Sequence, residues 1–159
     1  DVAILRSFAS NEFNPSQIHS NTVLFEPSLL QSKLPFAIIF NRQLSDLARY
    51  KVLVLAEQDA LSDQDLGFIR KFVENGGGLV ATGNSSLLTD WRTRREKLGL
   101  SDLFGFDLPP SEKAPGLLVQ RQFGKGRVVY IPRIDAASPA PPPQMNYYVR
   151  NALWKLPKN

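Results

Sequence analysis

The sequence predicts an α/β protein, a flavodoxin-like three-layer αβα sandwich whose mostly parallel sheet ends in a C-terminal β-hairpin. Short apolar runs without polar alternation recur along the chain, as strands covered on both faces require. Between two of these runs, apolar residues recur at helical spacing, so strand, helix and strand follow one another. Further along, two β-rich runs flank the glycine-bearing turn 124–126, a pattern typical of a hairpin.

The middle of the chain, residues 50–84, carries the clearest pattern. Lys51–Leu55 and Leu79–Thr82 are the two apolar runs that predict buried neighbouring strands. The helix between them is predicted to bury one face and expose the other; the buried residues are Leu66, Ile69, Phe72 and Val73, and the exposed ones Asp63, Asp65, Arg70, Lys71 and Glu74. Together they form a βαβ unit, whose crossover should be right-handed.

The start of this helix is predicted from its capping residues. Ser62 stands at the N-cap position, and Asp65 follows three residues later, so each side chain can accept a hydrogen bond from a free backbone N–H. Leu61 and Leu66 occupy the two positions of a hydrophobic staple.

The remaining elements follow in chain order. Before the central unit we expect a buried strand at 2–8, a loop at 9–20, a helix at 21–32 that Pro27 starts or breaks, a strand at 35–40 and a short helical turn at 43–50. After it we expect a helix near 90–98, aromatic packing at 101–106, a loop at 109–115, hairpin strands at 117–123 and 127–131, an extended proline-rich segment at 136–143, and an amphipathic helix, Asn146–Leu156, that covers one sheet face. The parallel strands should lie in the order second, first, third, fourth.

Composition sets the outer limits. We expect one domain spanning residues 1–159, cut from a longer polypeptide because the apolar run Val2–Leu5 follows Asp1 directly, although a processed terminus would look the same. The chain has no Cys, which excludes disulfides, a thiolate nucleophile and a Cys-based metal site. No apolar run reaches the roughly 20 residues of a bilayer span, so we expect no membrane partner. The compartment stays open.

The net charge of +4 and the pI near 9.5 raise the question of nucleic-acid binding. The only dense basic group comprises Arg92, Arg94, Arg95 and Lys97, with Glu96 inside it and without the alternating aromatic residues of a single-strand groove. We interpret this group as a solvated helix face and expect no nucleic-acid partner.

Candidate chemistry gathers at the carboxyl ends of the predicted strands, where open α/β sheets bind ligands. The turn Gly83–Ser86 is the most suggestive segment, but a nucleophile elbow needs a second Gly where this chain has Leu87. His19 is the only histidine and no orienting carboxylate motif accompanies it, so we expect a surface residue. Glu57 and Asp59 are expected to solvate or cap rather than to perform acid–base work. We predict no metal site and no cofactor, because the chain offers no ligand spacing.

Several segments together resemble a known family: the 50–84 unit with its ATGNSS turn, and the later FGKGRVVYIP and NALWKL. They are similar to the class I glutamine amidotransferase-like domain that follows the catalytic barrel in bacterial trimeric β-galactosidases. In active amidotransferases the strand that matches Leu79–Thr82 leads to a Cys nucleophile, and the strand that matches Val128–Ile131 leads to a His with a nearby Glu. The corresponding stretches here, 82–85 and 132–135, contain neither Cys nor His. The resemblance therefore implies the fold without its chemistry.

The same resemblance implies a function. In the β-galactosidases this domain is similar to an oligomerisation module, so we expect a non-catalytic accessory domain of a glycoside hydrolase whose partners are its own catalytic barrel and neighbouring subunits. The alternative is a small hydrolase or ligand-binding domain that uses the Gly83–Ser86 turn. No catalytic residue is predicted; the weak candidates for ligand binding are Asn84, Ser85, Arg133 and Asp135.

Overall fold

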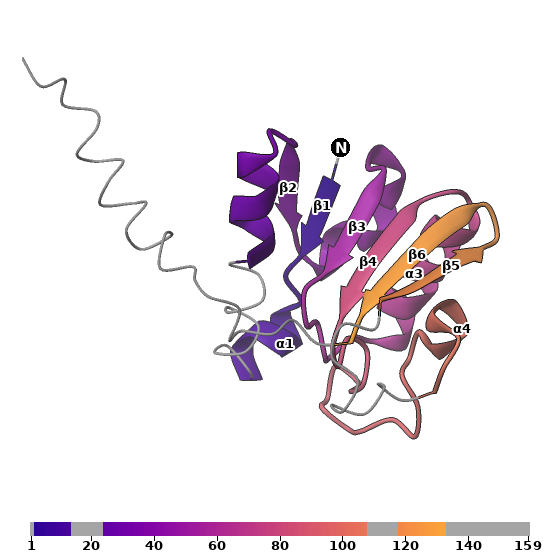
Figure 1. Cartoon of the computed structure of the whole chain (residues 1–159). Coiled ribbons are helices and arrows are strands. Elements are labelled where there is room, and N and C mark those ends of the chain that lie inside the picture. The colour runs from indigo at the N-terminus through magenta and orange to yellow at the C-terminus, as the bar shows by residue number, and fades with distance from the viewer. Residues whose placement is uncertain (1, 14–23, 108–117, 133–159) are drawn as a thin grey trace, which may run out of the picture.

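The computed structural model describes residues 2–13, 24–107 and 118–132, and these form a single α/β sheet structure (Figure 1). The sheet has six strands in the order β2-β1-β3-β4-β6-β5. The strands are β1 (Val2–Leu5), β2 (Phe36–Ile39), β3 (Val52–Leu55), β4 (Gly78–Thr82), β5 (Val119–Phe123) and β6 (Gly126–Ile131). All neighbouring pairs are parallel except β5 with β6, which form the hairpin. The predicted fold class and the order of the first four strands are confirmed.

Helices lie on both faces of this sheet. On one face, α3 (Asp63–Glu74), α4 (Ser101–Phe104) and the 3-10 helix η1 (Asn41–Arg49) enclose the main hydrophobic core with the side chains of all the central strands. On the other face, the helix at 24–31 packs Phe25 and Leu29 against a smaller core of Ile4, Val54 and Ala56. The sandwich therefore has unequal halves, and the larger one belongs to α3.

The start of α3 agrees with the sequence. The Ser62 hydroxyl accepts a hydrogen bond from the Asp65 N–H at 3.1 Å, and the Asp65 carboxylate accepts one from the Ser62 N–H, also at 3.1 Å. The four predicted apolar residues are all buried in the core. One detail was wrong: Asp65 is buried rather than solvated, because its carboxylate also accepts a hydrogen bond from the Asn41 amide at 2.8 Å.

The amino-terminal region differs from the prediction in three places. The first strand ends at Leu5, and α1 (Phe8–Phe13) replaces the expected loop after it. This short helix is held by Ser10, whose buried hydroxyl donates to the Ala60 carbonyl at 3.1 Å and accepts from the Ala60 N–H at 2.9 Å. The helix at 24–31 contains Pro27 within it, so this residue does not end the helix.

The predicted helix near 90–98 is absent from the described residues. Leu88 instead forms single bridges with Ala60 and with Arg94, and a tight turn between Thr89 and Thr93 reverses the chain. The basic group at 92–97 therefore does not lie on a helix face. Downstream, Leu103 and Phe104 are buried and Phe106 packs on Tyr130 with ring centroids 4.8 Å apart, as the predicted aromatic packing requires.

Several predictions fall on residues outside the described ranges: the loop at 109–115, the segment at 136–143, the helix Asn146–Leu156, and the side chains of His19, Arg133 and Asp135. Within the described ranges, none of the helices combines the length and the apolar character needed to cross a membrane.

Candidate functional site

The turn Gly83–Ser86 lies at the carboxyl end of β4, between the ends of its neighbours β3 and β6. The Gly83 N–H donates to the Ile131 carbonyl of β6 at 3.0 Å, and the Ser86 N–H donates to the Gln58 carbonyl after β3 at 2.9 Å. Gly83 has a φ of +50°, and a Cβ atom at this position would collide with the Glu57 carboxylate. The backbone of the turn therefore fits closely between the two flanking strands.

The Glu57 carboxylate joins the polar groups at the carboxyl ends of β3 and β4. It follows β3 and is only 5% exposed. Its carboxylate accepts a hydrogen bond from the Asn84 N–H at 2.9 Å and one from the Thr82 hydroxyl at 3.4 Å. Burial raises the pKa of Glu57 above its ordinary value, and the nearby Asp59 raises it further, while the bonds from Asn84 and Thr82 partly offset both effects.

Tyr130 joins the same group from β6. Its buried hydroxyl donates to the carbonyl of Gly83, which fixes the turn from a second side. Burial and the neighbouring Glu57 carboxylate both raise the pKa of Tyr130, so the phenol remains a hydrogen-bond donor at neutral pH. Tyr130 was not among the predicted site residues, although its place near the end of a strand next to β4 was the available signal.

The two serines of the turn are used within the fold. Ser85 is fully buried, and its hydroxyl lies 2.7 Å from the Thr82 carbonyl and 3.1 Å from the Leu55 carbonyl, so it donates to backbone oxygen. Ser86 is also fully buried, and its hydroxyl accepts from the Leu100 N–H at 3.1 Å. Of the four candidate ligand-binding residues, the structure thus places Asn84 and Ser85 in one turn, while Arg133 and Asp135 lie outside the described residues.

Glu57 and Asp59 are buried, which corrects the expectation that they are solvated. The other half of that expectation holds for Glu57, which caps the turn through the Asn84 N–H. Asp59 lies 3.7 Å from the Arg92 guanidinium, which in turn lies over the Phe13 ring at 5.5 Å from its centroid. The Asp59–Arg92 ion pair is therefore part of the packing between α1, the end of β3 and the loop after β4.

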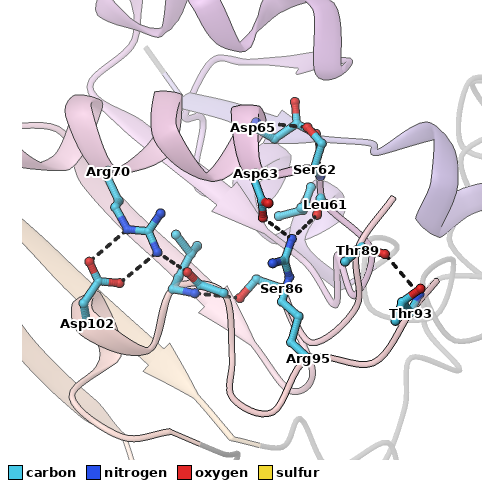
Figure 2. A network of polar contacts seen from close by, with 12 residues as sticks. Leu61, Ser62, Asp63, Asp65, Arg70, Ser86, Thr89, Thr93, Arg95 and Asp102 are labelled. Atoms are coloured by element: carbon cyan, nitrogen blue, oxygen red, sulfur yellow. Dashed lines mark hydrogen bonds and ion pairs between the residues drawn. The ribbon is translucent and has the colours of Figure 1, made fainter. Parts of the chain in front are cut away.

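That loop is fastened to α3 by a further set of polar contacts (Figure 2). Arg95 donates to the Leu61 carbonyl at 3.1 Å and pairs with Asp63 at 2.6 Å, while Arg70 pairs with Asp102 at 2.9 Å and donates to the Gly99 carbonyl. Two members of the basic group, Arg92 and Arg95, thus form intramolecular ion pairs. No local sequence pattern indicates these pairs, because the partners lie far apart along the chain.

A hollow that none of the predictions anticipated lies at the opposite end of the sheet. A groove of about 530 Å³ runs between η1 and the end of α3, lined by Leu44, Tyr50, Lys51, Phe68 and Lys71 among others. It contains none of the predicted site residues. Within the described ranges there is also no group of three or more His, Cys, Asp or Glu side chains that could hold a metal ion.

Comparison with known proteins shows the fold in larger molecules. No family model and no curated protein matches the sequence. Among solved structures, the GH42 β-galactosidase Gan42B of G. stearothermophilus superposes with a TM-score of 0.70 and 18% identity over 97% of this chain and 29% of its own. A cold-adapted β-galactosidase from a Rahnella species gives 0.69 and 15% over 99% of this chain and 31% of its own. An exo-β-1,4-mannosidase from an Opitutaceae bacterium gives 0.59 and 11% over 97% and 34%.

These identities are too low to show more than a common fold. The chain spans less than a third of the length of the two β-galactosidases above, 29% and 31%. The described residues thus have the fold of one part of several multidomain glycosidases.

Proposed function

We propose that this chain is a non-catalytic accessory domain of a β-galactosidase-like glycoside hydrolase, and that it packs against its own catalytic barrel and against neighbouring subunits. The observation that carries the proposal is the share of each chain that the structural match covers. Nearly all of this chain, 97% and 99%, superposes on 29% and 31% of two β-galactosidases. A match of this kind is expected of one domain in a larger enzyme. It also agrees with the resemblance to the amidotransferase-like domain that follows a catalytic barrel.

The buried serines at the carboxyl end of β4 support the proposal that the domain has no catalytic activity. Acyl transfer by a serine needs a hydroxyl that a base can reach and that a substrate can approach. The Ser85 hydroxyl is fully buried and donates to backbone carbonyls, and the Ser86 hydroxyl accepts from the Leu100 N–H. These contacts weigh against the alternative of a hydrolase that works from the Gly83–Ser86 turn.

Exposed aromatic side chains near the same edge support a role in association. Trp91 is 88% exposed, Phe8 71% and Phe13 62%, whereas Phe104 belongs to the core. Large contiguous apolar patches are uncommon on the surface of monomeric domains, and Trp and Tyr are enriched at the anchor points of interfaces. The accessory domain is thus proposed to use the α1 and Trp91 region against its partners.

The proposal is tested by comparing the full-length parent protein with a form that lacks residues 1–159. We expect light scattering to show fewer subunits per assembly in the truncated form. Its turnover of aryl glycosides should fall in proportion to the loss of assembly. Trp91→Ala in the full-length parent should weaken association, while Leu118→Ala, which removes a half-exposed apolar side chain just before β5 and outside α1 and the loop after β4, should not. A truncated parent that retains both its mass and its turnover, together with labelling of the isolated domain by a serine-directed phosphonate, would favour the hydrolase instead.

A further inference from the structure

One row of side chains crosses the sheet and passes from covered to open. Ile4, Val54, Val80 and Val129 are register partners on β1, β3, β4 and β6, so they point to the same face. Ile4 is 0% and Val54 3% exposed, because the helix at 24–31 lies over them. Val80 and Val129 are only half-buried. Among the described residues, the cover on this face is therefore complete over β1 and β3, only partial over Val80 of β4, which packs at the margin of the smaller core, and incomplete over β6.

On this face of β4 and β6, the described helices leave the sheet without a complete covering layer. Thr82 and Ile131 are the next register partners along β4 and β6; Thr82 is buried beside Glu57, whereas Ile131 is half-buried like Val80 and Val129. Parallel strands are found almost only in sheets that are covered on both faces. Figure 1 shows α3 behind β4 and β6, and none of the described helices in front of them. An apolar layer is thus expected over Val80, Val129 and Ile131.

We propose that this layer is supplied by the chain itself, through an amphipathic helix at Asn146–Leu156 that packs on the open face of β4 and β6. The described chain runs along β6 to Pro132, directly beside this face, and residues 133–159 follow. A helix that returns over β6 from its carboxyl end needs a connection first, and the proline-rich 136–143 segment is long enough to provide one.

The pattern and the dimensions both fit. Four apolar residues fall at i, i+3, i+4 and i+7 and would form one stripe: Val149, Ala152, Leu153 and Leu156. Asn151 falls on the opposite side of such a helix. As a helix, this range would be about 16 Å long and about 10 Å wide. The five residues of β4 span about 16 Å, and β3 to β6 span about 10 Å.

The covalent connection favours this occupant over a second molecule. A segment joined to β6 by a short linker has an effective concentration near its site in the millimolar range. A second copy of the chain, or the catalytic domain of the parent, would have to displace it.

Thiol accessibility tests the proposal, because the chain has no Cys of its own. Val128 and Val129 are consecutive on β6 and face opposite sides of the sheet; Val128 is buried under the α3 layer with 2% exposure. In the intact chain, we expect the thiol introduced by Val129→Cys to react slowly with an alkylating reagent at every protein concentration. The thiol from Gln120→Cys, on the exposed edge strand, should react rapidly and sets the reference rate.

Leu153→Asp should weaken the packing of the proposed helix and raise the alkylation rate at position 129 at least about tenfold. A tenfold increase corresponds to a free energy of local opening that is lower by about 1.4 kcal/mol. Asn151→Asp, with the same new residue on the opposite side of the helix, should leave the rate unchanged. The thiol from Val128→Cys should stay protected in both backgrounds, which shows that the α3 layer is intact. Should it become reactive, Leu153→Ala takes the place of Leu153→Asp and is read in the same way.

Four results would overturn the proposal. The thiol at position 129 could react as fast as the one at position 120 in the intact chain. Its protection could fall on dilution, which would identify a second copy as the cover, or arise only in the full-length parent, which would identify the catalytic domain. Equal rates in the Leu153→Asp and Asn151→Asp backgrounds would also exclude the helix. None of these results depends on whether the parent requires the domain for its assembly.

Discussion

Replacing Gly67 by alanine should stabilise this protein, although most substitutions destabilise one. Gly67 is exposed in the middle of α3, and a Cβ atom there would meet no other atom within 4 Å. Its backbone is helical, so alanine can adopt it without strain, and the unfolded chain loses conformational freedom. The expected gain in the free energy of unfolding is about 0.5–1 kcal/mol. For a chain of this size, 1 kcal/mol raises the melting temperature by about 2–4 °C.

The matched control is the same substitution at Gly83. There the φ of +50° is unfavourable for alanine, and the new methyl group would collide with the buried Glu57 carboxylate. Gly83→Ala should lower the free energy of unfolding by about 2 kcal/mol or more, since strain and displacement of a buried carboxylate add. Calorimetric melting of both variants decides the matter. A lower melting temperature for Gly67→Ala, or an unchanged one for Gly83→Ala, would refute the description of α3 and of the turn.

Three further predictions concern the core, the cap and pH. Leu66→Ala and Phe72→Ala should each destabilise by about 2–5 kcal/mol, since each leaves a cavity under α3. Ser62→Ala should cost about 1 kcal/mol through loss of the hydrogen bond from the Asp65 N–H. Because the pKa of Glu57 lies above its ordinary 4.5, its contribution to stability is complete below about pH 4.5 and is lost as the pH rises through the folded-state pKa. Glu57→Gln should therefore flatten the decline of stability over that pH range.

Denaturant midpoints measure all three effects. A smaller loss for Phe72→Ala than for Ser62→Ala would mean that the buried face of α3 is wrongly described. Parallel pH profiles for Glu57→Gln and the unmodified chain would show that the carboxyl is not desolvated in the folded state.

The parts of the fold that could be predicted are those whose signals are local. The β3–α3–β4 unit has a cap, a staple pair and a continuous apolar stripe within one segment; the structure shows the cap and buries the staple pair and the stripe in one core. The helix expected near 90–98 had only a weak pattern, and backbone bridges from Leu88 to Ala60 and Arg94 decide the conformation there. The short helix α1 was missed for the same reason, since Ser10 holds it through a bond to Ala60, fifty residues away in sequence.

The candidate site shows the same division. The position of the Gly83–Ser86 turn at the strand ends followed from the order of the elements. What the side chains do there did not follow, because it depends on which groups meet across strands. Glu57 was expected to be solvated or to cap, and the adjoining ends of β3 and β4 bring it against Thr82 and Asn84 in a buried setting, where it caps the turn. A serine in a tight turn can be a nucleophile or a structural donor, and only its contacts distinguish the two.

The place of β1 between β2 and β3 has a consequence for the order of assembly. β1 pairs with both β2 and β3, yet its β3 partners begin at Val52, so the first strand is synthesised well before the sheet around it can form. The β3–α3–β4 unit instead closes over a short stretch of chain, at a lower entropic cost. The sheet should therefore grow outward from its middle, with the amino-terminal strand inserted late. In pulse-labelled hydrogen exchange, amides of β3 and β4 should gain protection before those of β1, and the reverse order would contradict this pathway.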